Sequence, residues 1–130
     1  MTEADLATLF HGHADSVVTI LFGYFSVTSA FLVASYLTAR TLPTLLTYVV
    51  VALYSIAALS LIGYCHRHGT LMIEIREELI RLGATWHIAV TEPGFVLPTL
   101  NYTMVFAMLA IFFASIWYHF HARASEEGRF

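Results

Sequence analysis

The chain has 130 residues, of which 58% are hydrophobic and 12% are charged, and its formal net charge is -3. Soluble domains have about 45–50% apolar and about 25% charged residues, so a water-soluble fold could not bury this much apolar surface. The composition therefore indicates an integral membrane protein, and the small net charge gives no reason to expect nucleic acid as a partner. All six basic residues are arginine, and without lysine the chain cannot form a Schiff base with a retinal or pyridoxal cofactor.

Three stretches are long and apolar enough to cross a membrane, over residues of about 16–39, 43–64 and 99–120. A transmembrane helix needs about twenty mainly apolar residues, and none of these stretches contains Asp, Glu, Lys or Arg. The segment before the first stretch is acidic and has no basic residue, so we expect a retained anchor rather than a cleaved signal peptide. The length corresponds to a single membrane domain over residues 1–130.

Residues 70–82 have a different character, because apolar residues recur there at helical spacing while acidic residues and Arg81 take the opposite face. This segment is too charged to span, so we predict an interfacial amphipathic helix on the membrane surface, with Thr70 as its N-cap and Gly83 as its end. Residues 84–98 are interrupted by proline, glycine and polar residues and are predicted to form an interfacial loop. The predicted fold class is an all-α integral membrane protein with three transmembrane helices and one interfacial amphipathic helix.

Small residues follow one face of the first span and recur once on the third. Such stripes let helices approach closely in lipid, where no hydrophobic force drives their association. We favour packing against the other spans of the same chain, and a subunit interface is the alternative. The candidate helix-packing or interface residues are Gly23, Ser26, Ala30, Ala34, Ala110 and Ala114.

Six of the seven histidines form His-x-His pairs near the ends of the spans. Antiparallel packing of the first two spans would bring the pair that precedes the first span close to the pair that follows the second span. Imidazoles bind copper and zinc. The candidate metal ligands are His11, His13, His66 and His68. However, side chains two residues apart on a helix diverge, and histidines at span ends are also stable in the headgroup zone without any ligand. No cofactor is firmly implied, and copper or zinc is the metal to test.

We predict a small non-catalytic membrane subunit that assembles with copies of itself or with a larger membrane complex, for instance as an accessory subunit of a membrane enzyme. Three spans are too few for a secondary transporter, and the spans contain no buried charge for ion coupling. A homo-oligomeric channel lined by the hydroxyls of the first span is one alternative. A metal-binding membrane subunit that uses the histidine pairs is the other.

Three spans place the two termini on opposite faces of the membrane. The positive-inside rule does not choose between the two orientations, because each face carries three arginines: Arg67, Arg76 and Arg81 on one, Arg40, Arg123 and Arg129 on the other. Acidic residues crowd the N-terminal face. We therefore expect a bacterial inner-membrane protein with its N-terminus outside and its C-terminus in the cytoplasm.

Overall fold

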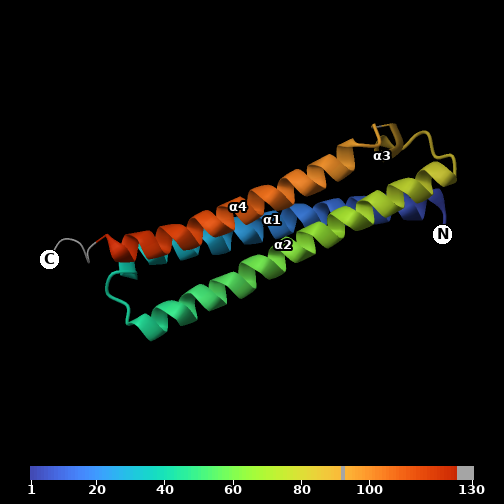
Figure 1. Ribbon diagram of the computed structural model, residues 1–130. Helices are drawn as coiled ribbons and strands as arrows, with labels where there is room; N and C mark the ends of the chain where they lie inside the picture. The colour runs from blue at the N-terminus through green and yellow to red at the C-terminus, as the bar shows by residue number, and fades with distance from the viewer. Residues whose placement is uncertain (92, 126–130) are drawn as a thin grey trace.

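The computed structural model describes residues 1–91 and 93–125, and this part of the chain is all-helical (Figure 1). It contains the helices α1 (Glu3–Thr38), α2 (Thr44–Arg81), α3 (Ile88–Thr91) and α4 (Val96–Ala124). The long helices α1, α2 and α4 form one elongated bundle, and each of them is long and apolar enough to cross a membrane. The predicted fold class is therefore confirmed.

Helix α1 begins well before the predicted first span. At a rise of about 1.5 Å per residue, its 36 residues extend about 54 Å, whereas the hydrocarbon core of a bilayer is about 30 Å thick. A capping box fixes its start: the Asp5 amide donates to the Thr2 hydroxyl at 3.2 Å, and the Thr2 amide donates to the Asp5 carboxylate at 2.9 Å. The polar N-terminal segment is thus helix rather than tail.

Residues 70–82 are helical and amphipathic, as predicted, but they extend α2 instead of forming a separate helix on the membrane surface. Thr70 is no N-cap, because its hydroxyl donates to the His66 carbonyl at 3.0 Å inside the continuous helix. The predicted end is confirmed, since Gly83 adopts a φ of 74° and the Ala84 amide donates to the Leu79 carbonyl at 3.1 Å. Helix α2 continues because its apolar face finds a partner on the extension of α1.

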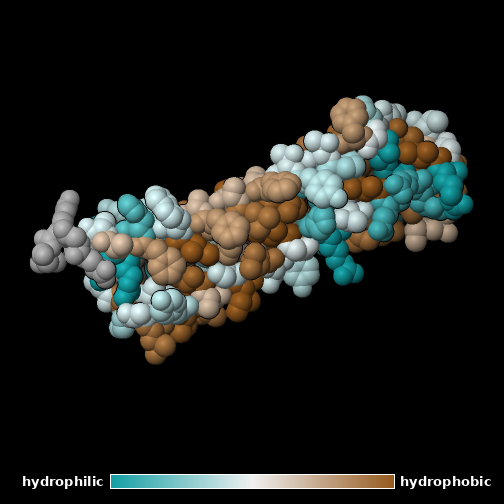
Figure 2. All heavy atoms as spheres, viewed as in Figure 1, coloured by the Kyte–Doolittle hydropathy of each residue, from teal (hydrophilic) through white to brown (hydrophobic). Residues whose placement is uncertain are grey.

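The two extensions pack together and form a second apolar core beyond the membrane-spanning part. This core contains Leu6, Phe10, Ile75, Leu79, Ala84 and Ala89. We call residues 3–15 and 70–91 the head. Figure 2 shows hydrophilic residues gathered over this end of the molecule, while hydrophobic residues dominate the middle of the bundle. Because its apolar face is covered from within the chain, residues 70–82 need no membrane surface to shield it.

The connection between α2 and α4 is held against α1 and α2 by two hydrogen bonds. The Trp86 indole N–H donates to the Glu3 carboxylate at 2.8 Å, and the Arg76 Nε donates to the Ala89 carbonyl at 2.7 Å. The predicted interfacial loop over residues 84–98 therefore includes α3 and the start of α4. Pro98 lies in the first turn of α4, where proline is well tolerated.

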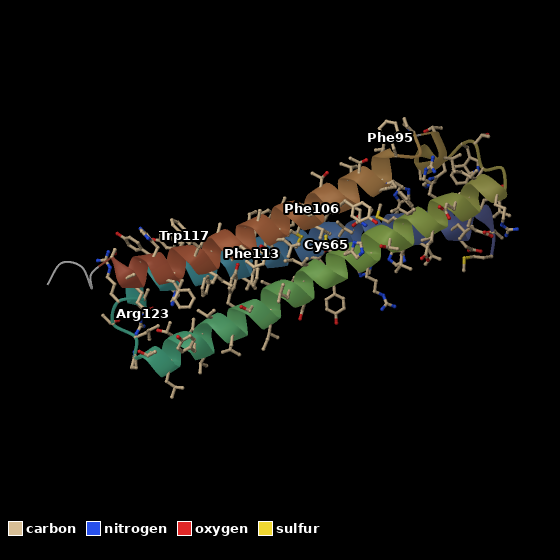
Figure 3. The ribbon with its side chains drawn as sticks, in the orientation of Figure 1. Cys65, Phe95, Phe106, Phe113, Trp117 and Arg123 are labelled. Atoms are coloured by element: carbon tan, nitrogen blue, oxygen red, sulfur yellow. The ribbon has the colours of Figure 1, made fainter. Side chains whose placement is uncertain are left out.

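Aromatic rings fill the centre of the membrane-spanning part. Phe31 stacks on Tyr54 with ring centroids 4.0 Å apart, and Tyr54 stacks on Phe112 at 5.7 Å. These rings come from α1, α2 and α4 in turn, so one layer ties all the long helices together. Bulky apolar side chains also point outward, among them Phe106 and Phe113 along α4, which are 69% and 64% exposed in the isolated chain (Figure 3). In a membrane these outward side chains contact lipid.

Arg123 closes the opposite end of the bundle, where its guanidinium reaches the turn between α1 and α2 (Figure 3). It donates to the Leu42 carbonyl at 2.9 Å, to the Thr44 hydroxyl at 3.0 Å and to the buried Thr47 hydroxyl. The planar fork of an arginine suits several acceptors at once. This side chain therefore joins the end of α4 to the start of α2.

We expect Arg123→Ala to lower the free energy of unfolding by about 2 kcal/mol, because it breaks these bonds and leaves the buried Thr47 hydroxyl without its donor. Thermal unfolding in a mild detergent measures the change. Arg123→Lys should recover only part of it. The control is Arg81→Ala, whose ion pair with Glu78 lies on the surface, where solvent screens it, so this change should alter stability little. Equal effects at the two positions would contradict this role of Arg123.

Candidate functional site

Polar side chains converge where the head meets the membrane-spanning part of the bundle. His13 on α1 and His68 on α2 face each other with their Nδ1 atoms 2.8 Å apart. Close by, the His66 Nδ1 lies 3.3 Å from the Asn101 Nδ2 of α4. We call the set of His13, His66, His68, Gly69 and Asn101 the junction site. It contains residues from each of the three long helices.

The His13–His68 contact has a definite proton requirement. A hydrogen bond between two Nδ1 atoms needs a proton on one of them and a lone pair on the other. The pair therefore holds one proton between the two rings, and two fully protonated imidazoles could not form it. Both side chains are half-buried between α1 and α2, so the bond helps to hold these helices together just outside the membrane-spanning part.

The structure divides the predicted metal ligands between different places. His13 and His68 meet, but the His11 ring packs near His87 with centroids 5.3 Å apart, and His66 contacts Asn101. The cause is helical geometry, because residues two apart on a helix are separated by about 200° of rotation. Over residues 1–91 and 93–125, no group of three or more His, Cys, Asp or Glu side chains is placed to hold a metal ion.

Gly69 and Asn101 make a close contact between α2 and α4. A Cβ atom added to Gly69 would lie 2.3 Å from the Asn101 Oδ1, so only glycine fits at this position without a shift. Asn101 is 4% exposed, and its Oδ1 has no hydrogen-bond partner among the described residues. The sequence signal for this contact is a lone amide in an apolar span, which on its own does not predict a partner.

An apolar cleft of about 380 Å³ opens beside the junction site, between α1, α2 and the first half of α4. Val17, Met72, Leu100 and Met104 contribute to its walls, and Gly69 and Asn101 lie at its polar edge. None of the described residues that line it carries a charge. The cleft was not predicted, because its walls come from distant parts of the chain.

His87 is a buried histidine in the connection between α2 and α4. Its Nδ1 accepts a hydrogen bond from the Ala89 amide at 3.1 Å, and its ring packs edge-on against Phe10 with centroids 5.3 Å apart. Burial lowers the pKa of His87 below its ordinary value, and the neighbouring His11 lowers it further. The neutral ring is therefore favoured at this position. A charged ring would lose the hydrogen bond from the Ala89 amide and would place its charge in a buried site.

The predicted helix-packing residues mostly face away from the bundle. Ser26, Ala30 and Ala34 are exposed on α1, opposite the side that packs on α2 and α4. The exception is Gly23, which is half-buried, with room for a Cβ 3.9 Å from Leu61. Packing within the chain, which the sequence favoured, is therefore wrong for the exposed stripe. The remaining candidates, Ala110 and Ala114, are also exposed.

The chain matches no protein family model, no curated protein and no solved structure. The geometry of the described residues defines a membrane protein with three long helices, an outward stripe of small residues, a junction site and an apolar cleft.

We expect the stability of the head to fall as the pH drops below about 6.5, the ordinary pKa of histidine. The folded-state pKa of His87 is depressed, so just below that pH the unfolded chain binds more protons than the folded one. Stability is thus fully present above this window and is lost as the pH falls through it. Hydrogen exchange of the α3 amides at about pH 7.5 and about pH 5, corrected for intrinsic rates, measures the loss.

His87→Gln keeps an acceptor for the Ala89 amide but does not titrate, so this variant should lose the pH dependence. His121→Gln, at an exposed position on the other end of α4, is the control and should keep it. An unchanged pH profile in His87→Gln would show that another group is responsible.

Two glycines of α2 should respond to alanine in opposite directions. Gly63→Ala should stabilise the protein by up to about 1 kcal/mol, because alanine is the better helix former and the added Cβ meets nothing within 4 Å. Gly69→Ala should destabilise it, because its Cβ displaces the Asn101 amide. Adding Asn101→Ala to Gly69→Ala should restore stability. Thermal unfolding of the three variants tests this, and the same shift for both glycines would refute the close contact.

Proposed function

We propose that the protein is a non-catalytic membrane subunit and that two copies associate through the exposed stripe of α1. The observation that carries this proposal is the outward position of Ser26, Ala30 and Ala34 on a helix long and apolar enough to span the membrane. These residues recur at every fourth position and so form one flat strip along the helix. Nothing else in the described chain covers that strip.

The chemistry of the strip suits close contact with another helix. The Ser26 hydroxyl donates to the Phe22 carbonyl at 2.8 Å, so its hydrogen bond is made within α1 and the hydroxyl needs no partner. Small side chains let two helix backbones approach, and van der Waals packing then drives association in lipid. Larger side chains such as Phe22 and Val33 flank the strip and would pack around it.

A second copy is the partner that we propose. In a two-fold pair each copy presents the same patch, so a strip that accommodates a helix on one copy also accommodates the matching helix of the other. The strip is uncharged and its side chains are short, so like faces do not repel or clash. A channel would have to form between such copies, because aromatic rings occupy the centre of a single bundle.

Cysteine cross-linking in native membranes tests this arrangement. In a Cys65→Ala background, which removes the buried native thiol, oxidation should convert Ser26→Cys largely into a covalent dimer. Ser60→Cys is the matched control, since Ser60 is an exposed hydroxyl residue on α2 outside the strip. Ala30→Phe should reduce the Ser26→Cys dimer about tenfold, because its ring would prevent close packing of the two strips. A loss of about 1.4 kcal/mol of packing energy lowers the association constant tenfold.

The proposal fails if Ser26→Cys and Ser60→Cys cross-link to the same extent, or if the protein extracted gently from its membrane has the mass of one copy. A complex that contains a different protein on this strip would replace the second copy as partner. The same mass measurement, with metals determined, tests the metal alternative, for which His13 and His68 are the ligands that lie together.

A further inference from the structure

The apolar cleft beside the junction site leaves one buried polar atom without a partner. The Asn101 Oδ1 makes no hydrogen bond within the described chain, although Asn101 is 4% exposed. An unsatisfied buried acceptor costs about 1–3 kcal/mol, so its presence calls for a compensating interaction. No assembly through the α1 stripe would supply one, because the stripe and Asn101 belong to different faces of the bundle.

The unpaired atom belongs to a side chain that lines the cleft. The Asn101 Nδ2 points to His66, which does not line the cleft. The Oδ1 lies over Gly69, which does line the cleft. The Oδ1 is itself covered, so a ligand reaches it once the amide turns toward the cleft. The Oδ1 occupies the space that a Cβ at Gly69 would take, so Gly69 is a requirement for this helix contact.

The walls of the cleft define the rest of the occupant. Its volume of about 380 Å³ is within the range of small-molecule pockets, about 300–1,000 Å³. Its described lining carries no charge, so a charged headgroup would lose its solvation without compensation. From Asn101 the wall continues along α4 to Ala107, about 9 Å further toward the middle of the span. An occupant thus places its polar end at the junction site and an apolar chain inside the membrane.

We propose that this cleft binds a neutral amphiphile whose head carries a hydroxyl group, which donates a hydrogen bond to the Asn101 Oδ1. An acceptor oxygen selects a hydroxyl over an ether or an ester. The same chemistry is offered by two sources, an acylglycerol and a hydroquinone with a lipid tail.

Photolabelling of the full chain in phosphatidylcholine nanodiscs tests the cleft. The probes are a photoreactive long-chain alcohol and its methyl ether, which has the same chain but no donor. We expect the alcohol to label the α4 segment that contains Met104 and Ala107 about fivefold more than the ether, the ratio that one net hydrogen bond supports. An unlabelled diacylglycerol and an unlabelled lipid hydroquinone then compete, and the one that displaces the label identifies the source.

Three variants separate the hydroxyl contact from the apolar fit. Asn101→Leu should abolish the preference for the alcohol while both probes still label the cleft. Ala107→Phe should reduce labelling by both probes about fivefold, because the ring occupies the cleft. Ala52→Phe, at an exposed position of α2 outside the cleft, should change nothing.

Equal labelling by the alcohol and the ether would overturn the proposal. So would label that spreads over the lipid-exposed faces of all the long helices and does not respond to Ala107→Phe, since bulk lipid alone would then fill the cleft. Failure of both competitors to displace the label also contradicts it. None of these outcomes depends on the cross-linking of Ser26→Cys, so this inference and the proposed association stand or fall separately.

Discussion

The whole structure depends on two antiparallel helices that are longer than a bilayer is thick. α1 and α2 have 36 and 38 residues, while about twenty residues are enough to cross the hydrocarbon core. Both helices must therefore continue into water at the same end, because the short turn at residues 39–43 fixes the other end. Outside the membrane their apolar faces have no lipid to cover them. They cover each other, and the head is the result.

This constraint also determines where the unusual side chains lie. At the level where lipid gives way to the head, the bundle must bury polar groups that would be solvated further out. The His13–His68 bond and the His66–Asn101 contact satisfy part of this need, and the absence of a Cβ at Gly69 lets α4 approach closely enough for the second. The Asn101 Oδ1 is left over. The junction site is thus a consequence of helix length as well as of residue type.

Hydropathy was sufficient to predict the three spans, because length and absence of charge are local properties. The head was missed for a different reason. Thr2 and Asp5 carry a recognisable capping box, and Leu6 and Phe10 have helical spacing, yet the segment is too polar to suggest a membrane element and too short to suggest a domain. Its partner surface on α2 lies about seventy residues further along the sequence, which is the separation between Phe10 and Leu79. The cleft could not be predicted either, because its walls are also far apart in the sequence. The two histidines of a pair point in different directions because of the rotation between residues of a helix.

The stripe and the cleft use different sides of α1, and this follows from the helix alone. Val17 lines the cleft, and Ser26 lies nine residues further on, a rotation of about 900° that leaves the two side chains on opposite sides. A second helix packed on Ser26, Ala30 and Ala34 would therefore leave the cleft between α1 and α4 open to lipid. Because the two surfaces do not compete, an associated pair would present two clefts, one in each copy. Association and ligand binding would then be independent unless they are coupled through the position of α4.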